Sequence, residues 1–238
     1  MTEYKYDLHV HTDEVSPCGK VPARDVVRMY KDAGYDGVVI TDHYFDGFFE
    51  SFGGQSWKEK TEHYLEGFRI ALNEGKQSGL KVFQGMEIRF QENSNDYLVF
   101  GIDEYFLKTN KELYKMNLRD FRKLIEDTGF LLVQAHPFRP FMIPAPPELI
   151  DGVEIYNGNP RHDSHNGLAY EYAFENHLLM TSGSDFHQPE DLARGGISVP
   201  EEISTSAEFI SAIRNLKTTE LIRNSTPEQS EAAPTEPD

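Results

Sequence analysis

The segment DLHVH, residues 7–11, limits the possible folds of this chain more than any other stretch. It ends an alternating run that predicts a strand over residues 4–10, and side chains along a strand point to opposite faces in turn. Asp7, His9 and His11 therefore share one face of that strand. Two imidazoles and a carboxylate at a strand end are typical of a metal site, so further ligands are expected elsewhere in the chain.

Strands and helices are predicted to alternate along the sequence. Strands are expected over residues 4–10, 37–41, 81–90, 97–102, 130–135, 152–156 and 178–182. Helices are expected over residues 22–33, 57–78, 117–128, 168–175 and 205–216. This order predicts a mainly parallel sheet with helices outside it, either a closed barrel or an open, doubly wound sheet.

Residues that can bind a metal follow five of the predicted strands. They are His9 and His11, Asp42 and His43, Glu87, His136, and Asp185 with His187. In a barrel, the C-terminal ends of parallel strands form one rim, which is where barrel enzymes carry their chemistry. An open sheet would spread these residues along a line too long for one metal cluster. We therefore expect a barrel, distorted or incomplete.

The composition limits the partners and the cellular setting. There are 23 basic and 40 acidic side chains, giving a net charge of -17, which disfavours nucleic acid as a partner because its phosphate backbone would be repelled. Cys18 is the single cysteine, so no intrachain disulfide can form, as expected for the reducing cytoplasm. We expect neither a signal peptide nor a membrane span.

The sequence predicts one domain followed by a tail. Residues 1–224 carry the alternating elements and are expected to form a single domain. Residues 225–238 (STPEQSEAAPTEPD) are acidic and almost without large apolar side chains, so we expect them to be disordered.

Five motifs in order along the chain resemble those of the polymerase and histidinol phosphatase (PHP) superfamily. They are DLHVHT, ITDH, GMEI, QAHP and GSDFH, and the likeness extends over residues 4–196. The resemblance implies an α/β fold of the PHP type, a distorted (β/α)7 TIM-like barrel. It also implies a cluster of two or three divalent metal ions (Mn, Fe or Zn) and an enzyme that hydrolyses phosphoric esters.

The resemblance also implies a role for each matching residue. The first metal would be bound by His9, His11, Glu87 and Asp185, the second by Glu87 and His136, and the third by His43 and His187. Asp7 and Asp42 would hold the imidazoles through hydrogen bonds rather than bind metal.

Two positions depart from the family pattern. Cys18, in the segment SPCG, stands where many members place a His or Asp ligand of the third metal. It is either a thiolate ligand, or the third site is weak or empty. Asp96 stands where members often place a His ligand of the second metal. As a ligand, its carboxylate would favour Mn or Fe over Zn. The alternative is an ordinary turn aspartate.

The predicted substrate is a small phosphomonoester resembling histidinol phosphate, a nucleotide or a sugar phosphate. A hydroxide held between two metals would attack phosphorus, since bound metal lowers the pKa of water. Arg139 is the strongest candidate for contacting the phosphate, ahead of Arg161 and Arg194. His187, if it binds no metal, would act as a general acid. The oligomeric state is left open.

Three other functions stay open at this stage. Two are a phosphotyrosine phosphatase and an exonuclease, both activities implied by the resemblance. The third is a metal-binding regulatory module without catalysis. The aromatic segment 44–56 is either a lid over the substrate or an apolar cover on the barrel or an oligomer contact.

Overall fold

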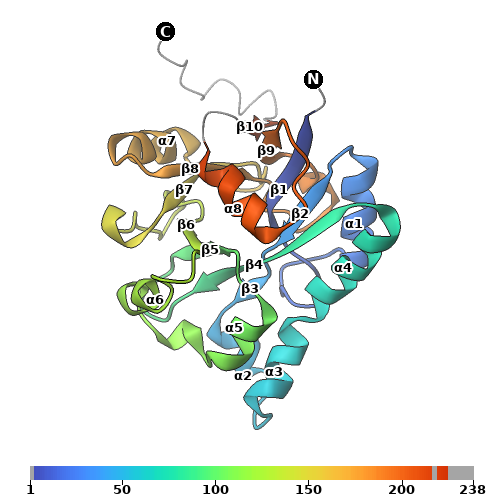
Figure 1. Cartoon of the computed structure of the whole chain (residues 1–238). Helices are drawn as coiled ribbons and strands as arrows, with labels where there is room; N and C mark the ends of the chain where they lie inside the picture. Colours follow the sequence, from blue (N-terminus) through green and yellow to red (C-terminus); the bar gives the residue numbers. More distant parts are fainter. Residues whose placement is uncertain (1–2, 216–218, 225–238) are drawn as a thin grey trace.

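The computed structural model describes residues 3–215 and 219–224, and Figure 1 shows how its elements are arranged. The strands are β1 (Tyr4–Val10), β2 (Gly37–Ile40), β3 (His43–Tyr44), β4 (Lys81–Arg89), β5 (Asp96–Phe100), β6 (Leu131–Gln134), β7 (Gly152–Asn157), β8 (Leu179–Gly183), β9 (Gly195–Val199) and β10 (Glu220–Arg223). The α-helices are α1 (Ala23–Asp32), α2 (Asp46–Glu50), α3 (Trp57–Tyr64), α4 (Glu66–Ser78), α5 (Glu104–Thr109), α6 (Leu118–Leu124), α7 (Asn166–Glu175) and α8 (Ser206–Arg214). Short 3-10 turns lie at Leu113–Lys115, Pro147–Leu149 and Pro189–Asp191.

The strands form one sheet that curls into a nearly closed barrel. Their order is β10-β9-β1-β2-β4-β5-β6-β7-β8, and β3 pairs with β4 beside this path. The segment after β8 returns to β1. There the Phe186 amide donates to the His9 carbonyl at 3.1 Å, and the His11 amide donates to the Phe186 carbonyl at 3.0 Å. This closure confirms the distorted TIM-like barrel and excludes the open sheet.

The direction of β5 brings an extra residue to the rim. β1, β2 and β4 run parallel to one another, as do β6, β7 and β8, whereas β5 is antiparallel to both of its neighbours. The start of β5 therefore lies at the edge of the barrel where the parallel strands end. Asp96, its first residue, pairs with Arg89 at the end of β4.

Helices cover the outside of the barrel, and apolar side chains fill its interior. Figure 1 shows α1 and α4 on one flank, with α6 and α7 on the opposite flank. The inner residues Tyr6 and Leu8 of β1 are fully buried and belong to an apolar cluster with Phe83 and Phe209. Burial of such side chains contributes on the order of 1.5–3 kcal/mol each, so this packing fixes the strands that carry the site.

The helix expected over residues 57–78 is bent into α3 and α4. The bend lies at Leu65, yet the backbone bonds continue across it, from the Leu65 amide to Thr61 and from the Arg69 amide to Leu65, both at 3.0 Å. Just after the bend, Gly67 packs so closely that a Cβ atom would lie 2.2 Å from Thr12 Oγ1. The bend thus lets α4 lie directly against the rim.

The aromatic segment 44–56 is part of the core. It contains the short helix α2, whose Phe48 and Phe49 are buried. The Phe49 ring stacks on Trp57 at 5.0 Å and on Tyr114 at 5.6 Å between centroids. This packing favours the apolar cover over the lid, because a lid would have to break these contacts each time it opened.

Some expectations fall on other parts of the chain. The tail 225–238 and Leu216, the expected end of the last helix, lie outside the described residues. Within the described ranges, no helix combines the length and apolar character needed to cross a membrane.

Candidate metal centre

Side chains from several strand ends meet at the C-terminal rim of the barrel. Their ligand atoms form four overlapping groups, each with all atoms within 4.8 Å of one another. The groups are His9, His136 and Asp185; His9, His11 and Glu87; Glu87, Asp96 and His136; and His11, His43 and His187. The structure thus brings together all eight of the His, Asp and Glu side chains predicted as ligands.

Glu87 lies at the centre of this cluster. Its carboxylate is 3.3 Å from His9 Nε2, 3.4 Å from His11 Nε2, 2.7 Å from His43 Nδ1 and 3.1 Å from His136 Nε2. Burial alone would raise its pKa, but His9 and His43 nearby hold the pKa of Glu87 well below its usual range. It is therefore an ionised carboxylate among four imidazoles, the geometry of a bridging ligand.

Asp185 is the second buried carboxylate of the cluster. Its Oδ1 lies 3.3 Å from His9 Nε2 and 3.5 Å from His11 Nε2, and its Oδ2 accepts from Arg139 Nη2 at 2.6 Å. Against the effect of burial, the Arg139 guanidinium and the His9 imidazole hold the pKa of Asp185 well below its usual range. Glu87 and Asp185 thus both approach the Nε2 atoms of His9 and His11.

Two ligands are held in an unfavourable backbone conformation. Asp185 has φ 52° and His136 has φ 30°, a region that residues other than glycine rarely occupy. Such a conformation costs roughly 1–3 kcal/mol and is concentrated at functional sites. Here it turns both side chains toward the cluster immediately after β8 and β6.

The orientation of His9 is fixed by a residue that the sequence analysis missed. Its Nδ1 donates to Glu154 Oε1 at 2.9 Å. Glu154 Oε2 accepts from the backbone amide of His136 at 3.1 Å and from the side-chain amide of Asn157 at 2.9 Å. Glu154 lies inside β7 and is buried. Gly183 makes room for this contact, because a Cβ atom there would lie 2.8 Å from Glu154 Oε1.

The orientation of His11 is fixed by the Ser16 hydroxyl. Ser16 Oγ donates to Asp42 Oδ1 at 2.8 Å and accepts from the His43 amide at 3.0 Å. Because its proton is used by Asp42, Oγ can only accept from His11 Nδ1, which lies at 3.1 Å. His11 therefore carries its proton on Nδ1.

His136 and His187 are arranged in the same way. His136 Nδ1 lies 3.1 Å from the Met142 sulfur, which only accepts, and His187 Nδ1 lies 2.9 Å from the Asp185 carbonyl oxygen. In both rings, as in His9 and His11, Nδ1 is the donor. Four imidazoles therefore keep a free lone pair on Nε2, the arrangement typical of histidines that bind metal.

The residues of the cluster fit divalent metal ions. Buried polar atoms normally have hydrogen-bond partners, yet the buried Nε2 atoms of His9 and His11 have none among the described residues. Their lone pairs face carboxylate oxygens of Glu87 and Asp185 at 3.3–3.5 Å, an arrangement that is repulsive without a cation. Although burial opposes it, Glu154 and Asp185 raise the pKa of His9 well above its usual value, so they favour positive charge at this position.

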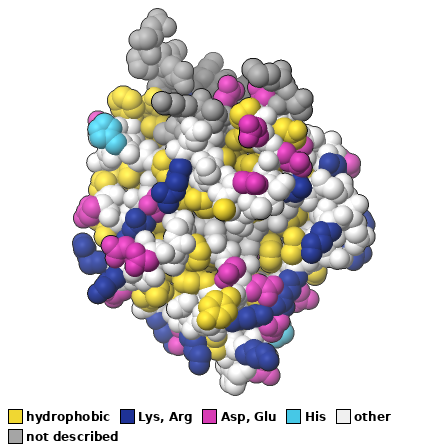
Figure 2. Space-filling model, in the orientation of Figure 1, with side chains coloured by type: hydrophobic (Ala, Val, Ile, Leu, Met, Phe, Trp, Pro, Cys, Tyr) yellow, Lys and Arg dark blue, Asp and Glu magenta, His cyan; other side chains and the backbone are white. Residues whose placement is uncertain are grey.

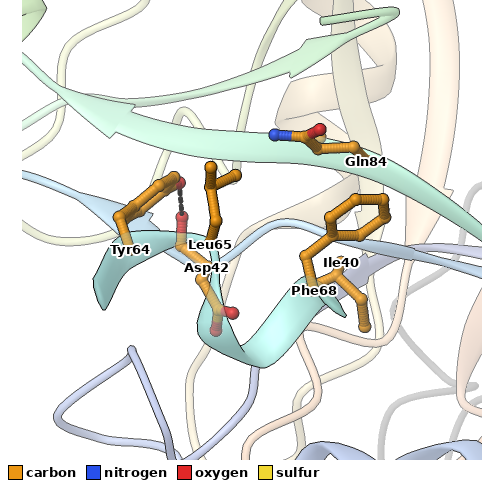
Figure 3. Close-up of a pocket in the computed structure, with 7 residues that line it drawn as sticks. Ile40, Asp42, Tyr64, Leu65, Phe68 and Gln84 are labelled. Carbon is orange, nitrogen blue, oxygen red and sulfur yellow. Dashed lines mark hydrogen bonds between the residues drawn. The ribbon is translucent and has the colours of Figure 1, made fainter. Parts of the chain in front are cut away.

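Asp7 does not share a face with His9 and His11, as predicted, because β1 shifts its pairing register between Asp7 and Val10; Asp7 accepts from the Tyr30 hydroxyl of α1 at 2.8 Å. Among the described residues, neither Asp7 nor Asp42 forms the hydrogen bond to an imidazole that the resemblance implied; Asp42 acts on His11 only through the Ser16 hydroxyl. Asp7 accepts from the amides of His9 and Ser184 at 3.2 and 3.0 Å. Asp42 accepts from the Thr12 amide at 2.7 Å, and its own carbonyl accepts from the Tyr64 hydroxyl at 2.8 Å (Figure 3). The carboxylates fix the segments that carry the ligands, while Glu154 and Ser16 fix the rings.

Asp96 belongs to the cluster and also forms an ion pair. Its two oxygens accept from Arg89 Nε at 2.7 Å and from Arg89 Nη2 at 2.6 Å. The Asp96 side chain is 3% exposed, whereas that of Arg89 is 45% exposed. Because each carboxylate oxygen has a second lone pair, this ion pair leaves Asp96 able to bind a metal together with Glu87 and His136.

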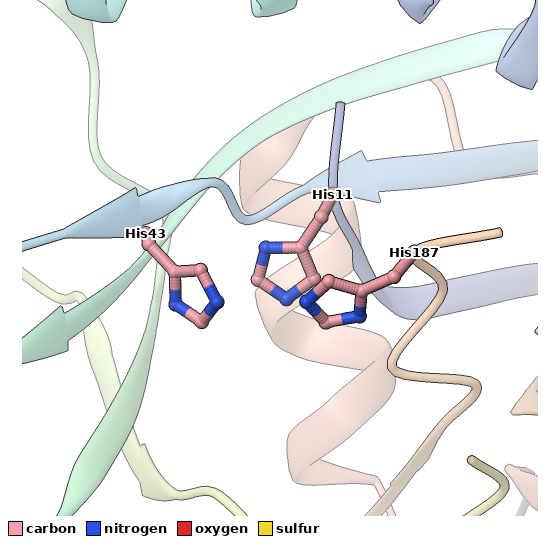
Figure 4. A group of neighbouring side chains, drawn as sticks. All are labelled: His11, His43 and His187. Carbon is pink, nitrogen blue, oxygen red and sulfur yellow. The ribbon is translucent and has the colours of Figure 1, made fainter. Parts of the chain in front are cut away.

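Cys18 lies at the other end of the cluster. Its sulfur is 3.2 Å from His43 Nε2, and the rings of His43 and His187 both lie close to that of His11 (Figure 4). Burial raises the pKa of the thiol, but hydrogen bonds with His187 and His43 outweigh it and lower the pKa to about 6. The exposed Cys18 is therefore mainly a thiolate at neutral pH.

The predicted arginines have different surroundings. Arg139 Nε donates to Ser164 at 3.0 Å and Nη2 donates to Asn157 at 2.7 Å as well as to Asp185, so its guanidinium lies at the cluster. Arg194 Nε donates to the Glu190 carbonyl at 2.7 Å instead. Within the described ranges, the Arg194 side chain makes no hydrogen bond or ion pair with the cluster, so its role at the substrate stays a prediction.

Arg161 and His162 follow β7 on the rim side. The Arg161 guanidinium is paired with the buried Asp191, which also accepts from the His187 amide at 2.9 Å. Burial and the charge of Arg139 lower the pKa of the exposed His162. Arg161 therefore supports the segment that carries His187.

The comparisons with known proteins agree with this description. A barrel with imidazoles and buried carboxylates gathered at its C-terminal rim defines a metal-binding α/β barrel. The PHP domain family model matches residues 7–188, and a second model described as PHP-associated matches residues 163–218. The chain belongs to the PHP domain family. A search of curated protein sequences found no match.

Solved structures share the fold at low sequence identity. A two-domain protein from Bacteroides vulgatus, containing a predicted PHP-like metal-dependent phosphoesterase, is 18% identical with a TM-score of 0.66; the match covers 93% of this chain and only 65% of that one. PsfC from Pseudomonas syringae is 17% identical with a TM-score of 0.69, covering 98% and 95%. A lesion-specific endonuclease from Pyrococcus furiosus is 14% identical with a TM-score of 0.61, covering 92% and 58%.

Proposed function

We propose that this protein is a metal-dependent hydrolase of small phosphomonoesters. One observation carries the proposal: buried imidazoles with free Nε2 lone pairs surround two ionised carboxylates, beside the guanidinium of Arg139. This combination suits a phosphate ester, because cations are needed to balance its charge. Membership of a family with metal-dependent phosphoesterases supports the same class of reaction.

The resident metals would be held by side chains of the cluster. His9, His11 and Asp185 would bind one ion, His136 and Asp96 another, and Glu87 would bridge the two. Divalent ions bound there would supply an activated water at neutral pH and positive charge for the phosphate oxygens. Glu154, Ser16 and Met142 keep the imidazoles in the tautomer that binding requires.

Arg139 would orient the phosphate. Its Nε and Nη2 are used by Ser164, Asn157 and Asp185, which fix the plane of the guanidinium. Nη1 has no hydrogen-bond partner within the described ranges, so it can donate to a phosphate oxygen. The roles of general acid and metal ligand compete for His187, because Nε2 is its one free nitrogen.

The charge of the chain supports a small substrate. Basic and acidic side chains are interspersed on the face in Figure 2, which favours small esters over nucleic acid. The overall charge of -17 acts in the same direction. The single cysteine supports a cytoplasmic setting, since intrachain disulfides cannot form.

A substrate panel tests this proposal. Metal-loaded protein would be assayed with histidinol phosphate, nucleoside monophosphates, sugar phosphates, phosphotyrosine peptides and single-stranded DNA, alongside metal analysis. We expect turnover of a small monoester that is lost, together with metal, in His9→Ala. Faster turnover of the phosphotyrosine peptide or of the DNA would show that the proposed substrate class is wrong. Loaded protein that hydrolyses none of them would instead be a metal-binding regulatory module.

A further inference from the structure

The two ends of the metal cluster offer different ligand atoms. At one end the group of His11, His43 and His187 lies beside the Cys18 sulfur, which is 3.2 Å from His43 Nε2. At the other end, Glu87 and Asp96 supply carboxylate oxygens and His136 supplies one nitrogen. Metals differ in their preference for sulfur, nitrogen and oxygen, so the two ends suit different ions.

The position of Cys18 is fixed by the folding of its segment. The Gly19 amide donates to the Ser16 carbonyl at 2.8 Å, and the Lys20 amide donates to the His187 carbonyl at 2.8 Å. Gly19 is required here, because a Cβ atom would lie 2.5 Å from the Thr12 carbonyl oxygen. These contacts hold the sulfur beside the imidazoles, whereas a cysteine on an unconstrained surface segment would move freely.

His11 supplies independent evidence for a ligand at this end. Its Nε2 is fully buried and has no hydrogen-bond partner in the described part of the chain, although its ring lies only 4.3 Å from His43 and 4.2 Å from His187 between centroids. Figure 4 shows the three rings converging. A cation bound at this end would therefore lie beside the Cys18 sulfur and close to this buried nitrogen.

The oxygen-rich end is equally well defined. Arg89 holds both oxygens of Asp96 at 2.6–2.7 Å, which fixes the orientation of the carboxylate. Two carboxylates with one imidazole favour Mn²⁺ or Fe²⁺, whereas a thiolate with imidazoles favours Zn²⁺. Within one cluster, Glu87 and His11 connect the two environments.

We propose that the cluster is heterometallic, with a thiophilic ion such as Zn²⁺ bound by Cys18, His43 and His187, and Mn²⁺ or Fe²⁺ bound by Glu87, Asp96 and His136. The inference rests on the metal-dependent function proposed above, but it concerns which ion is bound at each end and can be tested without turnover. It also assigns His187 as a metal ligand, leaving it unavailable as a general acid.

Cobalt binding tests the thiolate ligand in the wild-type protein. Because Cys18 is the single cysteine of the chain, any thiolate-to-cobalt charge-transfer band must come from it. We expect this near-ultraviolet band when metal-free protein is titrated with Co²⁺, and its loss in a Cys18→Ser variant with an unchanged circular dichroism spectrum. Absence of the band from the fully loaded wild type, or its persistence in Cys18→Ser, would overturn the proposal.

Competition between metals tests the division of the cluster. Protein loaded with Zn²⁺ and Mn²⁺ together should retain both after desalting. Cys18→Ser should weaken Zn²⁺ binding at least about tenfold and spare Mn²⁺, while Asp96→Asn should do the reverse. Asp127→Asn, at an exposed aspartate, is the control. Equal loss of both ions in both variants would contradict separate sites. Bound ions without phosphoester turnover would count against the proposed function alone.

Discussion

The apolar and the polar side chains at the end of β1 are buried to the same extent but stabilised in different ways. Tyr6, Leu8 and Val10 are 0% exposed, and so are Asp7, His9 and His11. The apolar side chains pack against rings and aliphatic side chains, Tyr6 and Leu8 in one cluster and Val10 in another beside α1, which stabilises the barrel without directional contacts. The polar side chains depend on directed partners, among them Glu154 for His9 and Ser16 for His11.

This difference separates folding from function within one segment. Burial of the apolar side chains stabilises the fold, whereas burial of unpartnered imidazole nitrogens costs free energy that only a cation can offset. Substitutions of the apolar side chains should therefore lower stability and leave the chemistry of folded molecules intact. Substitutions of the two histidines should impair the chemistry and lower the stability of the fold little.

The largest effect is expected at the histidines themselves. His9→Ala removes a nitrogen that faces both Glu87 and Asp185, so metal content should fall and turnover should drop at least about a thousandfold, or about 4 kcal/mol. Elemental analysis and steady-state kinetics measure this. Exposed His177→Ala serves as the control. Full turnover in His9→Ala would show that His9 takes no part in the site.

Leu8→Ala tests an apolar side chain of the same strand. The fully buried side chain would leave a cavity, so the free energy of unfolding should fall by about 2–5 kcal/mol. Urea denaturation measures the loss, and Leu168→Ala, at a leucine that is 48% exposed, should change stability little. A Leu8→Ala protein that keeps its stability but loses its metal would show that Leu8 serves the metal site rather than the fold.

Glu154→Gln sharpens the comparison by changing a partner and keeping every ligand. A glutamine offers one acceptor oxygen where Glu154 uses two for the donors on His9, His136 and Asn157. Metal affinity should fall about 10–100-fold, as for other residues that orient a metal-binding imidazole. Competition with a chelator measures it, with Glu171→Gln on the exposed side of α7 as control. Unchanged affinity would mean that packing alone orients His9.

The smallest effect is expected for charges at the surface. Arg69 donates to Glu104 at 2.7–2.8 Å, and this bond lowers the pKa of Glu104 to about 2. A carboxyl group with a lowered pKa stabilises the fold at pH values above its pKa in the unfolded chain, which is about 4.3. This stabilisation is lost as the pH falls toward 2. Because the pair is about one-third exposed, Arg69→Met should cost at most about 1 kcal/mol at pH 7.

Urea denaturation at pH 7 and pH 3 measures this difference. The gap between wild type and Arg69→Met should narrow at the lower pH. Lys58→Met provides the control, since Lys58 is exposed and makes no ion pair with a described residue. A gap that is the same at both pH values would show that Arg69 acts through packing of its hydrocarbon chain.

Most of the fold and the gathering of the main candidate ligands could be predicted because their signals are local. Alternation placed His9 and His11 on one face, and apolar runs located the strands that end near Glu87 and His136. The bend at Leu65 and the helix α2 were not predicted. Their cause is packing against segments distant in the sequence, which a local pattern does not contain.

The supporting residues of the site were harder to predict. Glu154 carried one signal, since it is a charged residue inside the buried strand sequence GVEIYN, but nothing local links it to His9. Met142 belongs to no motif, and Arg194 follows His187 closely in sequence while its side chain binds the Glu190 carbonyl. Beyond the end of a strand, closeness in sequence to a ligand says little about the direction in which a side chain points.

The sequence alone determined that His9 and His11 approach one site, because side chains two residues apart on a strand point the same way. It also determined that candidate ligands follow several strands. It did not place Asp7, because β1 shifts its pairing register between Asp7 and Val10 and Asp7 contacts Tyr30 of α1 instead. Only the tertiary structure decided that β8 returns to β1, that Glu154 reaches His9, and that the reversed strand β5 delivers Asp96 to the same rim. These contacts depend on the closure and curvature of the whole sheet, so no short stretch of sequence specifies them.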